Sequence, residues 1–255
     1  MLTRFLQAGR CRLALPLLLV VVLTGCSTYV TPGGPAPLNA VSRAAGADSQ
    51  AKAGFDRKPA ARFPAHLVAT RVQAAGYRSY SSHGYGSGKY SVVTVRDVES
   101  AADYQRITGW KGVAQLGTLN RMLLPERIES VDDLRGAAAQ LQADIVLLYT
   151  VDTQFIDRNS SALLTTISLG FGPTHEVQIN STASALFVDV RTGFVYGAAE
   201  ASSSQGDVSS VWRSASAADE ARQAAEKAAF RKLMDELEAT WAGIVNLYGQ
   251  APAQP

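Results

Sequence analysis

The stretch Asp144-Ile-Val-Leu-Leu-Tyr-Thr-Val151 decides the fold. After its first residue it is mostly apolar and β-branched, a composition that is enriched in β-strands. Apolar residues occupy both odd and even positions, so both faces of this strand need covering, as in a central strand between two layers. We therefore expect a sheet built around residues 144–151, with helices packed on it.

Two helices are predicted beside this strand. Before it, Ser130 is suited to cap a helix that has Asp133 three residues later. The apolar stripe of that helix is Leu134, Ala137, Ala138 and Leu141. Residues 219–248 give the strongest helical pattern in the chain. Its apolar positions are Ala221, Ala224, Ala225, Ala228, Leu233, Leu237, Trp241, Ile244 and Leu247, and its outer face is expected to carry Glu226, Lys227, Arg231, Asp235 and Glu238.

The remaining elements alternate less regularly. Strands are predicted at residues 65–73, 90–98, 163–171, 176–190 and 194–200, and a short helix at 101–107. Residues 77–90 and the Ser-rich residues 202–216 are predicted to be loops, and Arg191-Thr-Gly193 a tight turn. This order predicts an α/β (α+β) fold. Its sheet is mixed and largely antiparallel, with helices packed on it and a long C-terminal helix.

The N-terminus carries a targeting signal that ends in Leu23-Thr-Gly-Cys26. Arg4, Arg10 and Arg12 precede an apolar run at residues 13–23, and small residues follow that run. This is the order of a secretory signal, and the run is shorter than the about 20 apolar residues of a spanning helix.

The Leu-Thr-Gly-Cys ending resembles the lipobox of bacterial lipoproteins. The resemblance implies that residues 1–25 are a signal peptide cleaved between Gly25 and Cys26. It also implies diacylglycerol on the Cys26 thiol and an acyl chain such as palmitate on the new amino group. Several acyl chains hold a protein firmly to a membrane. Ser27, where Asp favours inner-membrane retention in such lipoproteins, implies the outer membrane with the domain facing the periplasm.

The chain after the signal divides by composition into three parts. Residues 26–59 are rich in Pro, Gly, Ala and Ser and are predicted to be a flexible tether with a maximum reach of about 100 Å. Residues 60–248 are predicted to form a single globular α/β domain, and residues 249–255 a disordered tail.

Charge and cysteine content exclude several classes of protein. The chain has 24 basic and 22 acidic residues, and removing the three Arg of the signal leaves 21 basic residues and a net charge of −1. Nothing in that balance points to nucleic acid. Cys11 lies in the signal and Cys26 is the predicted lipid site, so the mature chain has no thiol for a disulfide, a metal or a nucleophile.

No catalytic or metal-binding pattern stands out. His66, His83 and His175 lack the spacing of zinc ligands. The segment at residues 84–88 (GYGSG) lacks the Lys-Ser/Thr ending of a phosphate loop, and no G-x-S-x-G elbow occurs. Two weaker patterns are an acid–base pair of Asp152 with Asp157 and a contact surface formed by Tyr77, Tyr80, Tyr85 and Tyr90. For these we favour a solvated strand end and simple loop packing, with no enzyme activity, cofactor or metal.

The second half resembles the curli secretion lipoproteins of the CsgG type. The resemblance rests on a helix that runs into Asp144 and its strand, on Val188-Asp-Val-Arg-Thr-Gly193, and on an Ala-rich closing helix. It covers roughly residues 134–237 and implies a CsgG-like α/β domain. True pore formers insert two long hairpins. Here only residues 163–187 have the alternation of a spanning hairpin, and the second position, near 201–217, is polar.

Three hypotheses for the function follow. We favour a non-enzymatic outer-membrane lipoprotein that acts as a scaffold or assembly factor, bound to the membrane through its anchor and to other envelope proteins. A homo-oligomer is compatible with this. The alternatives are a subunit of a CsgG-like secretion channel, which the polar second hairpin disfavours, and a cell-wall or small-ligand hydrolase, which lacks its catalytic residues.

Overall fold

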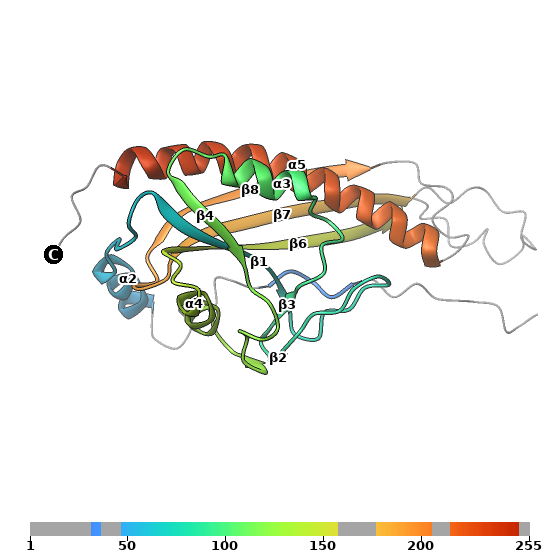
Figure 1. Cartoon of the computed structure of the whole chain (residues 1–255). Coiled ribbons are helices and arrows are strands. Elements are labelled where there is room, and N and C mark those ends of the chain that lie inside the picture. The colour runs from blue at the N-terminus through green and yellow to red at the C-terminus, as the bar shows by residue number, and fades with distance from the viewer. Residues whose placement is uncertain (1–31, 37–46, 158–176, 206–214, 250–255) are drawn as a thin grey trace, which may run out of the picture. The chain divides into compact units, whose positions relative to one another are not determined.

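A six-stranded mixed sheet organises the part of the chain that the structure describes (Figure 1). The computed structural model describes residues 32–36, 47–157, 177–205 and 215–249, which belong to one compact unit at residues 31–255. The strands are β1 (Ala65–Ala74), β2 (Ser87–Gly88), β3 (Tyr90–Val93), β4 (Val113–Thr118), β5 (Arg127–Ile128), β6 (Ile145–Asp157), β7 (Val177–Asp189) and β8 (Val195–Gln205). The helices are α2 (Ala47–Asp56), α3 (Ala101–Thr108), α4 (Val131–Gln140) and α5 (Ala215–Tyr248).

The sheet runs in the order β3-β1-β6-β7-β8, and β4 pairs with the first half of β1. The pairs β1–β3, β6–β7 and β7–β8 are antiparallel, whereas β1 is parallel to both β4 and β6. The strands β2 and β5 form a separate small sheet. The predicted fold class, a mixed and mostly antiparallel sheet with helices and a long C-terminal helix, is confirmed.

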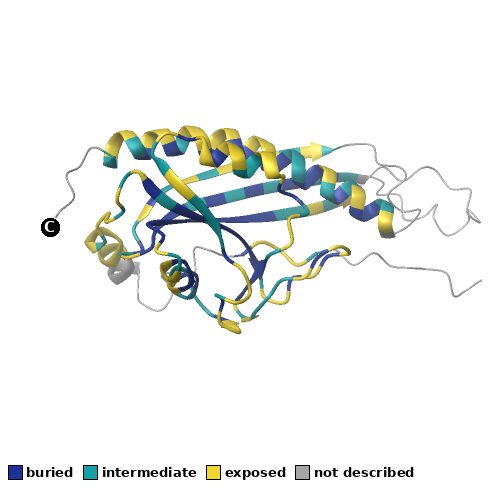
Figure 2. Cartoon of the chain, in the orientation of Figure 1, coloured by how far each residue is buried: buried dark blue, intermediate teal, exposed yellow. Residues whose placement is uncertain are grey.

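Helices cover both faces of the sheet. In Figure 1, α5 and α3 lie on one face and α4 on the other. On β6, Leu147 packs into the core on the α5 side and Leu148 into the core on the α4 side, and both are almost fully buried. Figure 2 shows the first half of β6 as a buried band between the two layers. The prediction of a central strand covered on both faces is therefore confirmed.

Strand boundaries differ from the sequence prediction at several places. The strand predicted at residues 90–98 ends at Val93, because Asp97 and Glu99 turn toward Arg71. β8 continues to Gln205, into residues predicted to be a loop, because its serines bond to β7: Ser202 to Thr182 and Ser204 to Gln178. β7 pairs with β6 over its whole length, and the strand predicted at residues 163–171 falls outside the described residues.

The predicted faces of α5 differ from the structure at three positions. Ala224 was expected in the apolar stripe but is exposed. Glu226 was expected to face water, but it is buried with 3% exposure because it pairs with Arg222 one turn earlier. Leu247 was expected in the apolar stripe, but it is 75% exposed, because it lies beyond the last buried turn of the helix around Trp241 and Ile244. The other charged positions predicted outside are exposed or half-buried.

Two parts of the predicted tether have a defined structure: the segment 32–36 and the helix α2. The backbone N–H of Ala74 donates to the carbonyl of Gly34 at 3.2 Å, and that of Ala36 donates to Thr150 Oγ1 at 2.9 Å. Pro35 forms a bridge with Gln73 of β1. β1 and β6 pair only over residues 67–70 and 145–148, so the short segment 32–36 docks beyond the point where their pairing stops. The helix α2 forms later in the same region.

The expected lipidation residue Cys26 and the cleavage position after Gly25 lie outside the described residues. Of the helices within the described ranges, none is both long enough and apolar enough to cross a membrane.

Candidate functional site

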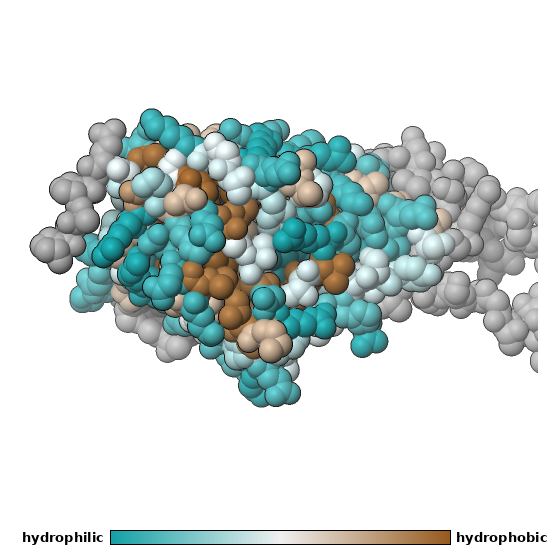
Figure 3. All heavy atoms as spheres, viewed as in Figure 1, coloured by the Kyte–Doolittle hydropathy of each residue, from teal (hydrophilic) through white to brown (hydrophobic). Residues whose placement is uncertain are grey.

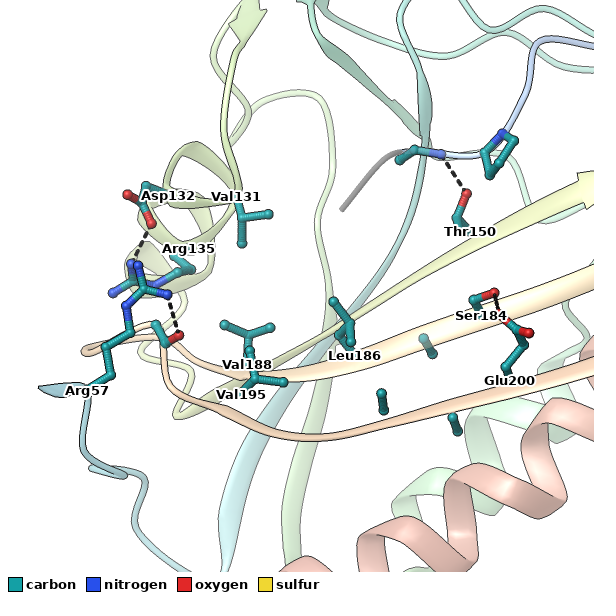
Figure 4. Close-up of a pocket in the computed structure, with 16 residues that line it drawn as sticks. Arg57, Val131, Asp132, Arg135, Thr150, Ser184, Leu186, Val188, Val195 and Glu200 are labelled. Atoms are coloured by element: carbon teal, nitrogen blue, oxygen red, sulfur yellow. Dashed lines mark hydrogen bonds and ion pairs between the residues drawn. The ribbon is translucent and has the colours of Figure 1, made fainter. Parts of the chain in front are cut away.

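A groove of about 730 Å³ lies on the face of the sheet opposite α5 (Figure 4). This volume is in the range of small-molecule sites. The groove lies where the docked segment 32–36, the residue after α2, the start of α4 and the strands β6 to β8 meet. Its lining consists of Pro35, Ala36, Arg57, Val131, Asp132, Arg135, Thr150, Ser184, Ala185, Leu186, Val188, Gly193, Val195, Ala198, Ala199 and Glu200.

The floor of the groove follows from strand alternation. Successive side chains on a strand point to opposite faces, so Leu186 and Val188 of β7 face the groove while Ala185 and Phe187 pack in the core under α5. On β8, Val195 and Ala198 are exposed on the same side. Val131, in the first turn of α4, forms the opposite wall (Figure 4). The floor is therefore aliphatic.

The polar rim is largely paired within itself. Arg135 forms an ion pair with Asp132 at 2.6 Å and donates to the carbonyls of Asp189, Val190 and Arg191, which ties α4 to the β7–β8 turn. Its neighbour Gly193 has φ 71°, and a side chain there would meet the Arg135 guanidinium.

Two charged side chains of the rim, Arg57 and Glu200, are accessible to solvent and make fewer contacts. Arg57 is half-buried and donates to the carbonyl of Gly193 at 3.4 Å, a long contact. Glu200 is exposed and accepts from Ser184 at 2.7 Å. A ligand in the groove would therefore meet an aliphatic floor between a guanidinium and a carboxylate.

Asp144 and Asp189, the two aspartates of the motifs that resemble the CsgG type, hold chain segments together beside the groove. Asp189 is fully buried and accepts four hydrogen bonds, from the backbone of Ala60, Arg191 and Thr192 and from the Tyr196 hydroxyl. Burial, and after it this contact to a carboxylate, raises the pKa of Tyr196.

Asp144 makes the matching tie at the start of β6. It accepts from the His66 backbone at 3.0 Å and pairs with Arg191 at 2.9 Å. These contacts join β1, β6 and the β7–β8 turn. Both aspartates therefore hold chain segments together and do not face a substrate site.

A second candidate is a buried ionic network under the first half of α5. Arg71 of β1 pairs with Asp97 at 2.7 Å and lies 3.7 Å from Glu99. On α5, Arg222 pairs with Asp219 at 2.9 Å and Glu226 at 2.5 Å, and lies 3.9 Å from Asp97. These two guanidinium and four carboxyl groups connect β1, the chain after β3, and α5.

Two opposing effects set the carboxyl pKa values in this network: burial raises them, and nearby arginines lower them. Burial raises the pKa of Glu226, and Arg222 and Arg71 only partly oppose it, because Arg222 is shared with Asp219 and Asp97. Burial acts on Asp97 too, but there Arg71 overcomes it and holds the pKa below its ordinary value. For Tyr149, burial and then the charge of Glu99 raise the pKa well above its ordinary value.

The network has no room for a substrate within the described residues. Tyr149 donates to Glu99 at 2.8 Å, and the space beside Tyr149 and Tyr104 is about 10 Å³, the volume of a single water at most. Glu99 Oε2 and Arg71 Nε have no hydrogen-bond partner among the described atoms. We interpret the network as a structural connection between strand and helix.

The residues singled out in the sequence do not come together as a reactive site. His66 lies half-buried on β1 and His83 is exposed in the loop after it, while His175 is outside the described residues. No group of three His, Cys, Asp or Glu within the described ranges could hold a metal. Asp152 accepts from Gln154, and for Asp157 the structure describes only the backbone.

The tyrosine and glycine patterns have structural explanations. Tyr77 and Tyr90 are buried and Tyr85 is half-buried, which leaves Tyr80 as the exposed member of the four. Gly88 has φ 99°, and a Cβ there would lie 2.5 Å from the carbonyl oxygen of Ile128. This glycine is required for the pairing of β2 with β5.

Sequence reasoning missed the groove and the network. The pairs Asp219–Arg222 and Arg222–Glu226 have the i,i+3 and i,i+4 spacing of helical ion pairs, so they were detectable as pairs, though not as buried. Nothing local marks Arg57, Ser184 or Glu200, which three distant segments bring to one groove. No protein-family model matches this chain, and a comparison with curated proteins finds no match either.

Proposed function

We propose that this chain is a lipid-anchored protein of the outer membrane. Its domain faces the periplasm and acts as a non-enzymatic scaffold or assembly factor for an envelope complex, with the groove as the place where a partner docks. The proposal rests on the lipobox-like Cys26 for location and on the CsgG-like order of motifs for the kind of protein. The observation that carries the docking role is the groove, with its aliphatic floor and charged rim.

The chemistry of the groove favours binding over catalysis. The pair closest to a nucleophile and base is Ser184 with Glu200. The backbone of Ser184 lies in a strand that pairs on both sides, with Thr150 on β6 and Glu200 on β8. Its amides are therefore part of the two ladders and are not available as an oxyanion hole. The exposed aliphatic side chains Val195 and Ala198 instead offer a contact area for a partner.

The surface seen in Figure 3 fits a domain that works in water. Hydrophilic side chains there separate the apolar ones, which gather in patches and form no continuous band on this face. A lipid-facing surface would be apolar over most of its height.

The anchor is tested by Cys26→Ala. The variant should lose lipidation and stay an uncleaved or mislocalised precursor, because Cys26 is the only cysteine after the signal. The measurement is labelling with a palmitate analogue, followed by membrane fractionation. A variant that still labels and fractionates with the outer membrane would contradict the lipobox interpretation.

The docking role is tested by photo-crosslinking in intact envelopes. A crosslinking amino acid at Ala198, in the groove, should give a discrete product with another envelope protein. The control carries the same amino acid at Met122, which is 92% exposed and lies away from the groove. Products that are absent at both positions, or identical at both, would reject the groove as the docking surface.

A further inference from the structure

The docked segment 32–36 fixes where the chain enters the domain. The carbonyl of Gly34 accepts from Ala74, the last residue of β1, and Ala36 donates to Thr150 near the middle of β6. The segment is antiparallel to β1, and β1 is parallel to β6. Going back from Ala36 to Pro32, the chain therefore points toward the end of the sheet where β6 finishes.

Other contacts also place Pro32 at this end of the domain. A Cβ on Gly33 would lie 3.5 Å from the Cα of Tyr77, at the start of the loop that contains Tyr80. The next residue of that loop, Ser81, accepts from Arg222 and Gln223 near the start of α5. β6 ends, β7 begins and β8 ends at this end of the sheet, and Figure 1 shows the start of α5 there as well.

The chain between the lipid site and this docking point is short. Cys26 and Pro32 are six positions apart, which limits their separation to about 20 Å even when the chain is fully extended. The sequence-based expectation of a reach of about 100 Å assumed a free tether up to residue 59. Docking at residues 32–36 removes most of that length.

We propose that the end of the domain that carries Pro32, Tyr80 and Ile156 faces the bilayer that holds the anchor, at close range. This rests on the proposed lipidation of Cys26. The partner of this surface is the membrane itself. The far end, with the β7–β8 turn and the C-terminal end of α5, then points into the periplasm. The 34 residues of α5 separate the two ends by about 50 Å.

The test uses the lipidated full-length protein in phosphatidylethanolamine and phosphatidylglycerol liposomes. A single cysteine, labelled with a fluorophore, is introduced as Tyr80→Cys or Ile156→Cys at the near end, and as Leu247→Cys at the far end. These side chains are 65%, 40% and 75% exposed, and the acylated Cys26 leaves no other thiol to label. A nitroxide on the lipid headgroup should quench both near-end labels and leave the far-end label at the level of nitroxide-free liposomes.

A second variant tests the role of the short connection. About 30 Gly and Ser residues inserted between Ser27 and Thr28 add roughly 30 Å of mean reach, so quenching at the near end should be lost. The same insert between Ala251 and Pro252 is the matched control and should leave it unchanged. Equal quenching at both ends, or near-end quenching that survives the first insert, would overturn the proposal. A failed anchor is distinguishable, because that protein would not float with the liposomes.

Discussion

At the residue scale, Leu147 is the sharpest test of the core. Leu147→Asp places an unpaired charge on a strand buried from both faces, which should lower the free energy of unfolding by several kcal/mol. The measurement is thermal melting followed by circular dichroism. Leu247→Asp is the matched control, since that side chain is 75% exposed and should melt like the wild type. A Leu147→Asp variant with the wild-type melting temperature would contradict the central position of β6.

Glu226 predicts a pH dependence of stability. Its folded-state pKa lies above the ordinary value of 4.5, so the folded protein holds this proton more tightly than the unfolded chain. That stabilisation is full below the unfolded pKa and is lost as the pH rises through the folded pKa. Glu226→Gln has no ionisable carboxyl here and so does not lose this stabilisation. The melting temperature of the variant minus that of the wild type should therefore increase as the pH is raised from 4.5.

The control for this pH profile is Glu236→Gln, an exposed position on the same helix. Because this side chain is exposed, the melting temperature of the variant should stay close to that of the wild type. A difference that stays constant with pH for Glu226→Gln would show that the Glu226 carboxyl stays charged in the folded protein, with Arg222 as a sufficient partner.

At the scale of elements, the docking of segment 32–36 depends on Thr150. Its hydroxyl accepts from Ala36 and donates to Gln73 Oε1 at 2.6 Å, so Thr150→Val leaves two buried polar groups unpaired, at about 1–3 kcal/mol each. We expect a lower melting temperature and faster proteolysis at residues 32–36. Thr182→Val is the control, because its partner Ser202 is exposed to water. Equal protease sensitivity of both variants would contradict the docking.

The elements that the sequence predicted well are those whose pattern is local. The capping box of α4, in which Asp133 accepts from the Ser130 backbone, is visible at the predicted positions, and so are the apolar strand β6 and the turn at Gly193. The segment 32–36 was mispredicted because its partners lie far along the chain, Thr150 being 114 positions from Ala36. Short segments rich in Pro and Gly carry no periodicity that reveals such a partner.

The candidate groove was not predictable for the same reason. Each of its lining side chains is ordinary within its own segment: a valine at a helix start, small residues on two strands, an arginine after a helix. Only the register of β6, β7 and β8 brings them to one face. The burial of Glu226 could not be inferred either. The helical pattern shows which residues share a face of α5, but not that Thr153 of β6 packs against Glu226 and donates a hydrogen bond to it.

At the scale of the whole molecule, the scaffold and channel hypotheses predict different behaviour. Residues 31–255, produced without the signal and Cys26, should purify without detergent, and the full lipoprotein should leave liposomes electrically silent. The reason is that one candidate spanning hairpin cannot satisfy its own edges in lipid, where each unpaired backbone group costs several kcal/mol. A large ring that needs detergent and opens stable conductance steps would favour the channel.

The parallel pairing of β1 with β6 also has a consequence for how the protein reaches this structure. Gln73 donates to the carbonyl of Val151, 78 positions later in the chain, and no local turn can align two parallel strands. Such distant pairing makes folding slow, and the apolar strands lack their cover on one face until α5, the last of the described elements, has formed. A chain that emerges N-terminus first therefore has a long interval of exposure to aggregation. Its yield should depend on a holding chaperone more strongly than its final stability would indicate.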